Sequence, residues 1–135
     1  SEKRRLLMED TLESLHRAVS VVRQGATLGD IGYAVESFLA PKGYGLVRNY
    51  AGHGIGRKLH EAPQVPNYGK PGSGVMLKRG MTLAIEPMVM TGNETVVSGE
   101  DEWTVVTADG SDAAHFEHTV LVCEDGPEVL TPWES

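Results

Sequence analysis

Residues 50–68 separate two parts of the chain that differ in periodicity, and they have the sequence Tyr50-Ala-Gly-His-Gly-Ile-Gly-Arg-Lys-Leu-His-Glu-Ala-Pro-Gln-Val-Pro-Asn-Tyr68. Glycines surround His53 in this stretch, and a second histidine, His60, follows them. Glycines at this density let the backbone approach another group closely. Taken alone, the stretch is equally typical of a ligand-binding histidine and of a glycine-rich turn whose histidine is simply hydrogen-bonded.

Residues 4–43, upstream of this stretch, have the periodicity of two helices. The first runs to residue 24 and is closed by Gly25, with an apolar stripe at alternating spacings of four and three: Met8, Leu12, Leu15, Val19 and Val22. The second starts at Thr27, a good N-cap, and Asp30 completes a capping box. Its apolar stripe consists of Leu28, Ile31, Val35 and Phe38. We therefore expect a helical pair.

Residues 44–135 are predicted to form an antiparallel sheet. Residues 61–80 contain three prolines and four glycines, which indicates an ordered loop. A hairpin is expected around residues 91–101, and the strand candidates are Met81–Val89, Trp103–Thr107, His115–Cys123 and Pro127–Leu130. Helices followed by strands predict an α+β fold, two helices packed on an antiparallel sheet, and 135 residues fit a single domain, 1–135.

Two glutamates lie within apolar strand candidates. Glu86 alternates to the face opposite Leu83 and Ile85, and an unpaired buried carboxylate is costly. It therefore needs a metal, another cation or hydrogen-bond donors, unless that face is solvated and carries a lysine partner. Glu117 points away from the face that carries His118, so we interpret His118 as a core or supporting residue and not as a ligand.

His53, Glu86 and Glu117 together suit a divalent ion such as manganese, iron, cobalt or zinc. Carboxylates can bridge two ions about 3.5–4 Å apart, which then activate water for amide hydrolysis. Competing motifs are incomplete, because His60-Glu61 lacks the second histidine of a helical zinc protease motif and no cysteine pair exists for structural zinc.

Composition excludes several classes of partner. The formal net charge is −7 without any basic cluster, so we do not expect nucleic acid as a partner. No apolar run approaches the roughly 18 residues of a membrane span, so no membrane partner is expected. Cys123 is the single cysteine, which favours a reducing compartment such as the cytoplasm.

The whole stretch from Tyr50 to Tyr68 resembles the signature segment of type I methionine aminopeptidases. The patterns Ile-Glu86-Pro-Met, Trp103-Thr-Val and Phe-Glu117-His118-Thr follow in the family's order and at similar spacing. The resemblance covers nearly the whole chain. It implies the pita-bread fold, in which two related halves enclose a metal site, and it implies that this chain is the carboxyl-terminal lobe, with the helical pair at 4–43 and the ligand-bearing sheet at 44–135.

The resemblance also implies roles for individual residues. His53, Glu86 and Glu117 would be ligands of two divalent ions, with Glu117 bridging them. Glu86 would also handle the proton of the attacking water, and His60 would contact the scissile peptide and stabilise the tetrahedral intermediate. The residues expected to line the pocket for the methionine side chain are Tyr50, Leu59 and Trp103. The implied reaction is removal of the initiator methionine from nascent polypeptides in the cytoplasm.

The chain departs from the family in length. A whole enzyme is roughly twice as long, and its amino-terminal half contributes two aspartate ligands and another substrate-binding histidine. Asp101 and Asp112 follow the glycine-rich histidine, whereas the family's aspartates precede it, so they are not substitutes. We expect a fragment that pairs with its missing half or with another copy, because half of a fold leaves an apolar face uncovered.

Two other functions remain open at this point. A proline-specific peptidase of the same fold shares the histidine–glutamate–glutamate order, although Glu86-Pro87-Met88 and the segment through Tyr68 favour the methionine enzyme. A non-catalytic lobe that has kept the fold is the second alternative. Retention of His53, Glu86 and Glu117 argues against it, because an idle site does not need buried carboxylates.

Overall fold

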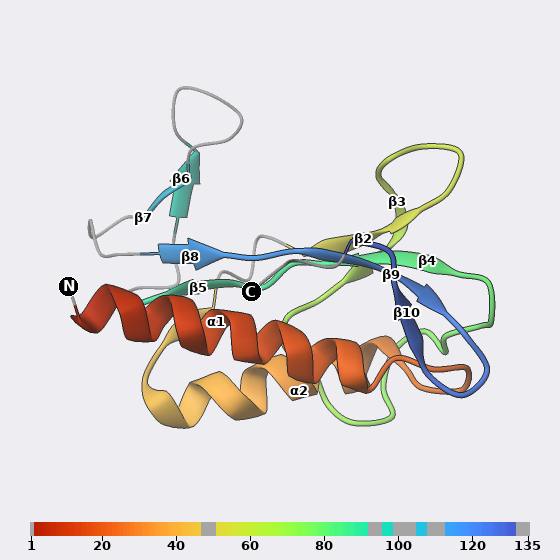
Figure 1. The fold of residues 1–135 in the computed structure, drawn as a ribbon, viewed down its shortest axis with the longest axis horizontal. Helices are drawn as coiled ribbons and strands as arrows, with labels where there is room; N and C mark the ends of the chain where they lie inside the picture. Colours follow the sequence, from red (N-terminus) through yellow and green to blue (C-terminus); the bar gives the residue numbers. More distant parts are fainter. Residues whose placement is uncertain (1, 47–50, 92–95, 99–104, 108–112, 132–135) are drawn as a thin grey trace.

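Two helices cover one face of an antiparallel sheet layer in the computed structural model, which describes residues 2–46, 51–91, 96–98, 105–107 and 113–131 (Figure 1). The helices are α1 (Glu2–Ser20), α2 (Leu28–Leu39) and the short 3₁₀ helix η1 (Ala40–Lys42). The strands are β1 (Gly45–Leu46), β2 (Gly52–Ile55), β3 (Glu61–Val65), β4 (Thr82–Ile85), β5 (Met88–Met90), β6 (Val96–Ser98), β7 (Val105–Thr107), β8 (Ala113–His115), β9 (His118–Val122) and β10 (Pro127–Val129). The predicted α+β class is confirmed.

The described strands form three antiparallel sheets. The five-stranded sheet has the order β10-β9-β4-β2-β3, the three-stranded sheet has the order β1-β5-β8, and β6 pairs with β7. The predicted hairpin of β9 and β10 is confirmed, with Pro127 opposite Val122. Of the hairpin expected around residues 91–101, the structure describes β6 alone, and the strand expected at 103–107 is described as β7.

The buried face of α1 includes part of the predicted stripe, because Leu15 and Val19 are buried and Leu12 packs at the edge of the core. Met8 is 54% exposed, whereas Thr11 and Ser14 are fully buried. Their hydroxyl groups donate within the helix, Thr11 to the carbonyl of Leu7 at 2.7 Å and Ser14 to that of Thr11 at 2.6 Å. Because these hydroxyls are satisfied locally, they can face the core, and the hydrophobic pattern alone gave no signal for them.

The end of α1 was also predicted too late. The helix stops at Ser20. Val22 N then donates to the carbonyl oxygen of Val19 at 3.1 Å, three residues back, where an α-helical bond would reach four residues back. Beyond it, Gln24 N donates to Cys123 O and Gly25 N donates to Leu77 O. The backbone leaves the helix because these main-chain bonds tie it to neighbouring strands and loops.

The start of α2 follows the local sequence signal. Asp30 N donates to Thr27 Oγ1 at 3.2 Å, and Thr27 N donates to Asp30 Oδ2 at 2.8 Å, so the predicted capping box is present. In the predicted stripe, Ile31 and Val35 are fully buried and Phe38 packs at the edge of the core. The capping box therefore fixes both the start of the helix and the face that it buries.

Residues 61–65 were predicted as loop but form β3. This strand lies at the edge of the five-stranded sheet, where it pairs only with β2 among the described strands. Pro63 lacks an N–H group, which excludes it from a central strand but not from an edge. The prediction failed because proline counts against a strand only when both sides of the strand are paired.

The helices and sheets enclose a single apolar cluster. α1 contacts β4, β5 and β8, and α2 contacts α1 and β3. The cluster joins buried residues of both helices to the inner face of the sheets, including Leu15, Ile31, Leu83, Ile85 and Val120. No helix in the described ranges is both long and apolar enough to cross a membrane.

Candidate metal centre

His53 lies on β2, between β3 and β4 in the five-stranded sheet. A Cβ atom at Gly52 would lie 2.0 Å from the carbonyl oxygen of Ala84. One at Gly54 would lie 2.5 Å from the carbonyl oxygen of Ala62. Neither carbonyl can move away without breaking the sheet. The two glycines therefore allow β2 to pack closely against both β3 and β4, which fixes the position of the His53 imidazole.

Glu86 and Glu117 lie at two matching breaks in long strands. The predicted strand at 81–89 is divided into β4 and β5, and the one at 115–123 is divided into β8 and β9. β4 pairs with β9 so that Ile85 faces His118, and the same register continues in the β5–β8 pair. Glu86 therefore lies opposite Glu117, on neighbouring backbone segments.

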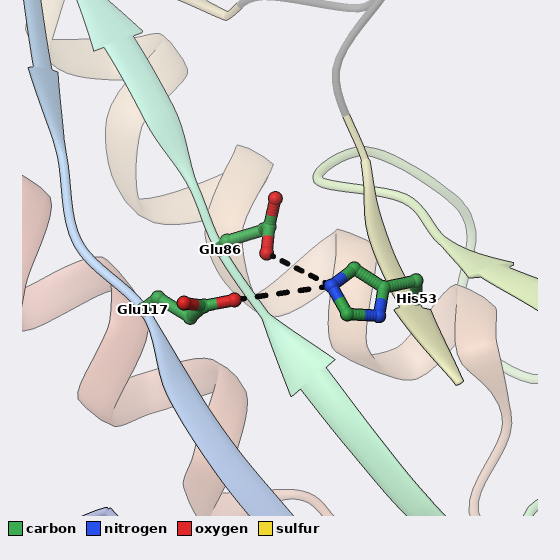
Figure 2. A group of neighbouring side chains, drawn as sticks. All are labelled: His53, Glu86 and Glu117. Atoms are coloured by element: carbon green, nitrogen blue, oxygen red, sulfur yellow. Dashed lines mark ion pairs between the residues drawn. The ribbon is translucent and has the colours of Figure 1, made fainter. Parts of the chain in front are cut away.

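The three side chains converge on one point (Figure 2). His53 Nε2 lies 3.5 Å from Glu86 Oε2 and 3.9 Å from Glu117 Oε2. One nitrogen or oxygen atom from each residue lies within 4.8 Å of the others. His53 Nδ1 is 3.1 Å from the carbonyl oxygen of Gly54. A carbonyl only accepts, so a neutral ring keeps its proton on Nδ1 and presents the Nε2 lone pair to the carboxylates.

The two carboxyl groups lie close together, and they differ in their exposure to solvent. The side chain of Glu86 is 17% exposed and that of Glu117 is 44% exposed. The pKa of the Glu86 carboxyl group rises from 4.5 to about 8, first through burial and then through the hydrogen bond and negative charge of Glu117. The ionised form of this pair is therefore unfavourable unless a cation lies beside it.

The donor set fits a divalent metal ion. Within the described part of the chain, neither carboxylate forms an ion pair with lysine or arginine. One imidazole nitrogen and two carboxylate oxygens are ligands that manganese, iron, cobalt and zinc accept. A cation at their meeting point would balance the charge that raises the pKa of Glu86. In the ranges that the structure describes, the two carboxylates thus lack a compensating positive charge, which a divalent metal ion would supply.

Two further histidines lie near this cluster and differ in their surroundings. The ring of His60 lies with its centroid 3.9 Å from that of His53, at an interplanar angle of 37°. His60 itself is exposed, so it stands at the solvent side of the cluster. His118 is 5% exposed, and its Nδ1 lies 2.6 Å from the carbonyl oxygen of Thr131. The interpretation of His118 as a core residue is confirmed.

The model of metallopeptidase family M24 matches residues 1–124. The chain belongs to this family. An M24 chain is expected to carry metal ligands, which agrees with the cluster of His53, Glu86 and Glu117.

Curated relatives of this M24 chain are methionine aminopeptidases. One from Clostridium acetobutylicum is 49% identical over 131 residues, which is 97% of this chain and 52% of the relative. Methionine aminopeptidase 1 of Bacillus subtilis is 45% identical over 97% of this chain and 53% of its own length. The M24 chain therefore spans about half the length of the curated relatives it matches.

Solved structures give the same result for the fold. Methionine aminopeptidase from Thermotoga maritima superimposes with a TM-score of 0.91 and 50% identity, over 96% of this chain and 52% of that one. Prolidase from Pyrococcus furiosus matches with a TM-score of 0.75 and 28% identity, over all of this chain and 34% of the other. The M24 chain has one half of the pita-bread fold, as the sequence predicted.

The structure describes only some of the residues that are expected to bind substrate. Tyr50 and Trp103 lie outside the described residues. Leu59 is 70% exposed and precedes His60 in the loop between β2 and β3. Its predicted role in a methionine pocket therefore needs a second surface to cover it.

Asn67 is a residue that the sequence analysis did not single out. It is 1% exposed, and its Nδ2 donates to the carbonyl oxygen of Glu86 at 3.2 Å. The two residues are 19 positions apart. Sequence carries no signal for this contact, because the periodicity of neither segment connects them.

Proposed function

We propose that the protein to which this chain contributes is a methionine aminopeptidase, which removes the initiator methionine from nascent polypeptides. In this proposal His53, Glu86 and Glu117 hold divalent metal. The observation that carries it is the convergence of one imidazole nitrogen and two carboxylate oxygens within 4.8 Å. Identities of 45–50% to methionine aminopeptidases, against 28% to a prolidase, favour methionine as the residue that is removed.

Two divalent ions of cobalt, manganese, iron or zinc would fit the proposal, in which His53, Glu86 and Glu117 would hold them and Glu117 would serve both ions. The chemistry that bound ions supply is activation of water at neutral pH and polarisation of the scissile carbonyl. Glu117 is the more exposed of the two carboxylates, which suits a ligand that faces a second ion. This chain offers three ligand residues in the cluster, so complete coordination requires ligands from elsewhere.

Other steps of the reaction are assigned to individual residues of the chain. Glu86 would accept the proton of the attacking water, because its carboxylate lies where the side chains of His53 and Glu117 converge and the water would be activated there. His60 is exposed beside His53 and donates a hydrogen bond to the developing oxyanion. In the proposal, Tyr50, Leu59 and Trp103 would help line the pocket for the thioether side chain.

The proposal includes a partner surface. The relatives are about twice as long as this chain, so their other half, or a second copy of this chain, would cover the exposed side of the cluster and supply the missing ligands. Leu59, at 70% exposure, belongs to the surface that this partner would cover. Cys123 is unpaired, which suits the cytoplasm, where nascent chains are processed.

Peptide hydrolysis tests the proposal directly. The chain would be assayed alone and after mixing with the amino-terminal half of the Clostridium acetobutylicum relative, with manganese or cobalt, on Met-Ala-Ser and on Gly-Pro. The proposal expects release of methionine by the mixture and not by the mixture that contains Glu117→Gln. Cleavage of Gly-Pro in preference to Met-Ala-Ser would favour a proline-specific peptidase. A stoichiometric complex without hydrolysis of either peptide would favour a non-catalytic lobe.

A further inference from the structure

The buried amide of Asn67 makes a long-range contact with the backbone of Glu86. Asn67 follows β3, and its Nδ2 donates to the Glu86 carbonyl oxygen at 3.2 Å. The Glu86 carbonyl lies in the break between β4 and β5, where the regular ladder is interrupted. A side chain therefore takes the place of a strand neighbour at this point.

A hydrogen bond to this carbonyl restrains the direction of the Glu86 side chain. The peptide group between Glu86 and Pro87 is planar and rigid. Pro87 also biases the residue before it toward an extended backbone. With the carbonyl held by Asn67, rotation of the peptide plane after Glu86 is restrained, and the direction of the Cα–Cβ bond from which the carboxylate extends is restrained with it.

The oxygen of the same amide indicates what Asn67 contributes. Among the described residues, Asn67 Oδ1 is buried and accepts no hydrogen bond. A buried polar atom without a partner costs free energy, and an apolar side chain of similar size would avoid this cost. An amide at this position therefore provides the hydrogen bond to the Glu86 carbonyl, which an apolar side chain could not donate.

Helix α2 holds the loop that carries Asn67. A Cβ atom at Gly32 would lie 2.1 Å from the carbonyl oxygen of Tyr68, so the loop lies directly against the helix backbone. Gly69 N donates to Glu36 Oε1 at 3.3 Å, and Gly72 N donates to the helix residue Asp30 at 2.8 Å. The position of Asn67 is thus set by a rigid element outside the cluster.

We propose that Asn67 is a positioning residue of the metal centre, which orients Glu86 toward His53 and Glu117 through its hydrogen bond to the Glu86 carbonyl. The inference rests on the proposed function in taking Glu86 as a metal ligand. Asn67 is not one of the three residues of the cluster and contacts it through the Glu86 carbonyl, so its substitution would act through Glu86. Loss of such a supporting hydrogen bond typically weakens metal binding by roughly 10–100-fold.

Asn67→Leu separates positioning from a merely structural role. Leucine fills similar space and removes the unpaired Oδ1, which offsets the loss of the bond to the Glu86 carbonyl. The melting temperature should therefore change little, while Co²⁺ affinity falls by roughly 10–100-fold and the visible Co²⁺ spectrum shifts. Asn67→Asp, which has no N–H to donate when ionised, should show the same loss. Leu15→Ala, in the fully buried part of α1, should lower the melting temperature and leave the Co²⁺ spectrum unchanged.

The carbonyl ¹³C resonance of Glu86 in the metal-free chain supplies a second readout. Asn67→Leu should move this resonance and that of the Glu86 carboxyl carbon, whereas Leu15→Ala should move neither. Absence of Co²⁺ bands in the unsubstituted chain would count against the proposed function, and the carbonyl resonance would still decide the role of Asn67. Unchanged Glu86 resonances in Asn67→Leu, or unchanged Co²⁺ affinity and spectrum, would overturn the inference.

Discussion

Glu86 lies opposite Glu117 in the antiparallel register that runs from the β4–β9 pair into the β5–β8 pair. Like charges in opposite positions on neighbouring strands destabilise a sheet. Protonation of Glu86 or binding of a cation relieves this repulsion. Raising the pH should therefore destabilise the metal-free chain, whereas adding divalent metal should stabilise it.

The free energy of unfolding of the metal-free chain should fall between pH 5 and pH 8. The folded-state pKa of Glu86 is raised from 4.5 to about 8, so within this window the folded chain binds more protons than the unfolded chain, and stability decreases as pH rises. Urea unfolding in the presence of a chelator measures this dependence. Glu86→Gln should flatten the slope. Glu124→Gln, at a side chain that is 71% exposed, should retain it.

Divalent metal should stabilise the chain, increasingly so as pH rises. Ligands must lose their protons to bind metal, so binding competes with protonation of Glu86. At a metal concentration 100 times the dissociation constant, stability should rise by about 2.7 kcal/mol. Thermal unfolding with and without Mn²⁺ measures the gain. His53→Ala should abolish it and His16→Ala should preserve it, so an equal gain in both variants would place the metal elsewhere.

Gly52→Ala should damage both fold and site. Its Cβ atom would lie 2.0 Å from the carbonyl oxygen of Ala84, which forces β2 away from β4 and shifts His53. We expect a loss of about 1–3 kcal/mol in the free energy of unfolding, together with weaker Mn²⁺ binding. Gly126→Ala is the matched control, because a Cβ atom there meets nothing within 4 Å. Similar losses in the two variants would mean that the close approach at Gly52 is not what positions His53.

Thr27→Ala should weaken the fold without affecting the metal centre directly. It removes the side-chain oxygen that accepts from Asp30 N at 3.2 Å, and loss of such a cap costs about 1 kcal/mol. Chemical denaturation measures the loss, and Thr27→Ser should restore most of the stability. A Thr27→Ala chain as stable as the original would show that the capping box contributes nothing.

His60→Ala should impair hydrolysis in the reconstituted enzyme while metal affinity stays unchanged. His60 lies beside His53 but outside the three-residue cluster, so its loss removes an oxyanion donor and no ligand. Loss of one such donor lowers kcat by about 10²–10³-fold. Steady-state kinetics on Met-Ala-Ser, with Mn²⁺ titration as the companion measurement, tests this. A His60→Ala enzyme with unchanged kcat would remove His60 from the proposed mechanism.

The parts of the fold that could be predicted from sequence are those set by neighbouring residues. The Thr27–Asp30 capping box and the β9–β10 hairpin depend on residues a few positions apart, and both are present. The resemblance over residues 50–68 supplied the fold and also indicated that His53 belongs with two distant glutamates. Alternation within a strand gave the direction of Glu117 relative to His118, which is buried as expected.

The parts that could not be predicted depend on side-chain hydrogen bonds or on contacts between distant segments. Thr11 faces the core because its hydroxyl bonds to Leu7 within the helix, which hydrophobicity does not register. Pro63 lies in a strand because that strand is at a sheet edge. The contact from Asn67 to Glu86 spans 19 residues and follows from how α2 supports the loop. The strand at Pro63 and the Asn67–Glu86 contact are both determined by tertiary structure.

Paramagnetic line broadening by Mn²⁺ in the NMR spectrum tests the metal centre most directly. At substoichiometric Mn²⁺, resonances of His53, Glu86 and Glu117 should broaden first, and this selectivity should disappear in Glu117→Gln. Broadening that begins instead at exposed acidic residues such as Glu124, with those three resonances unaffected, would contradict the account.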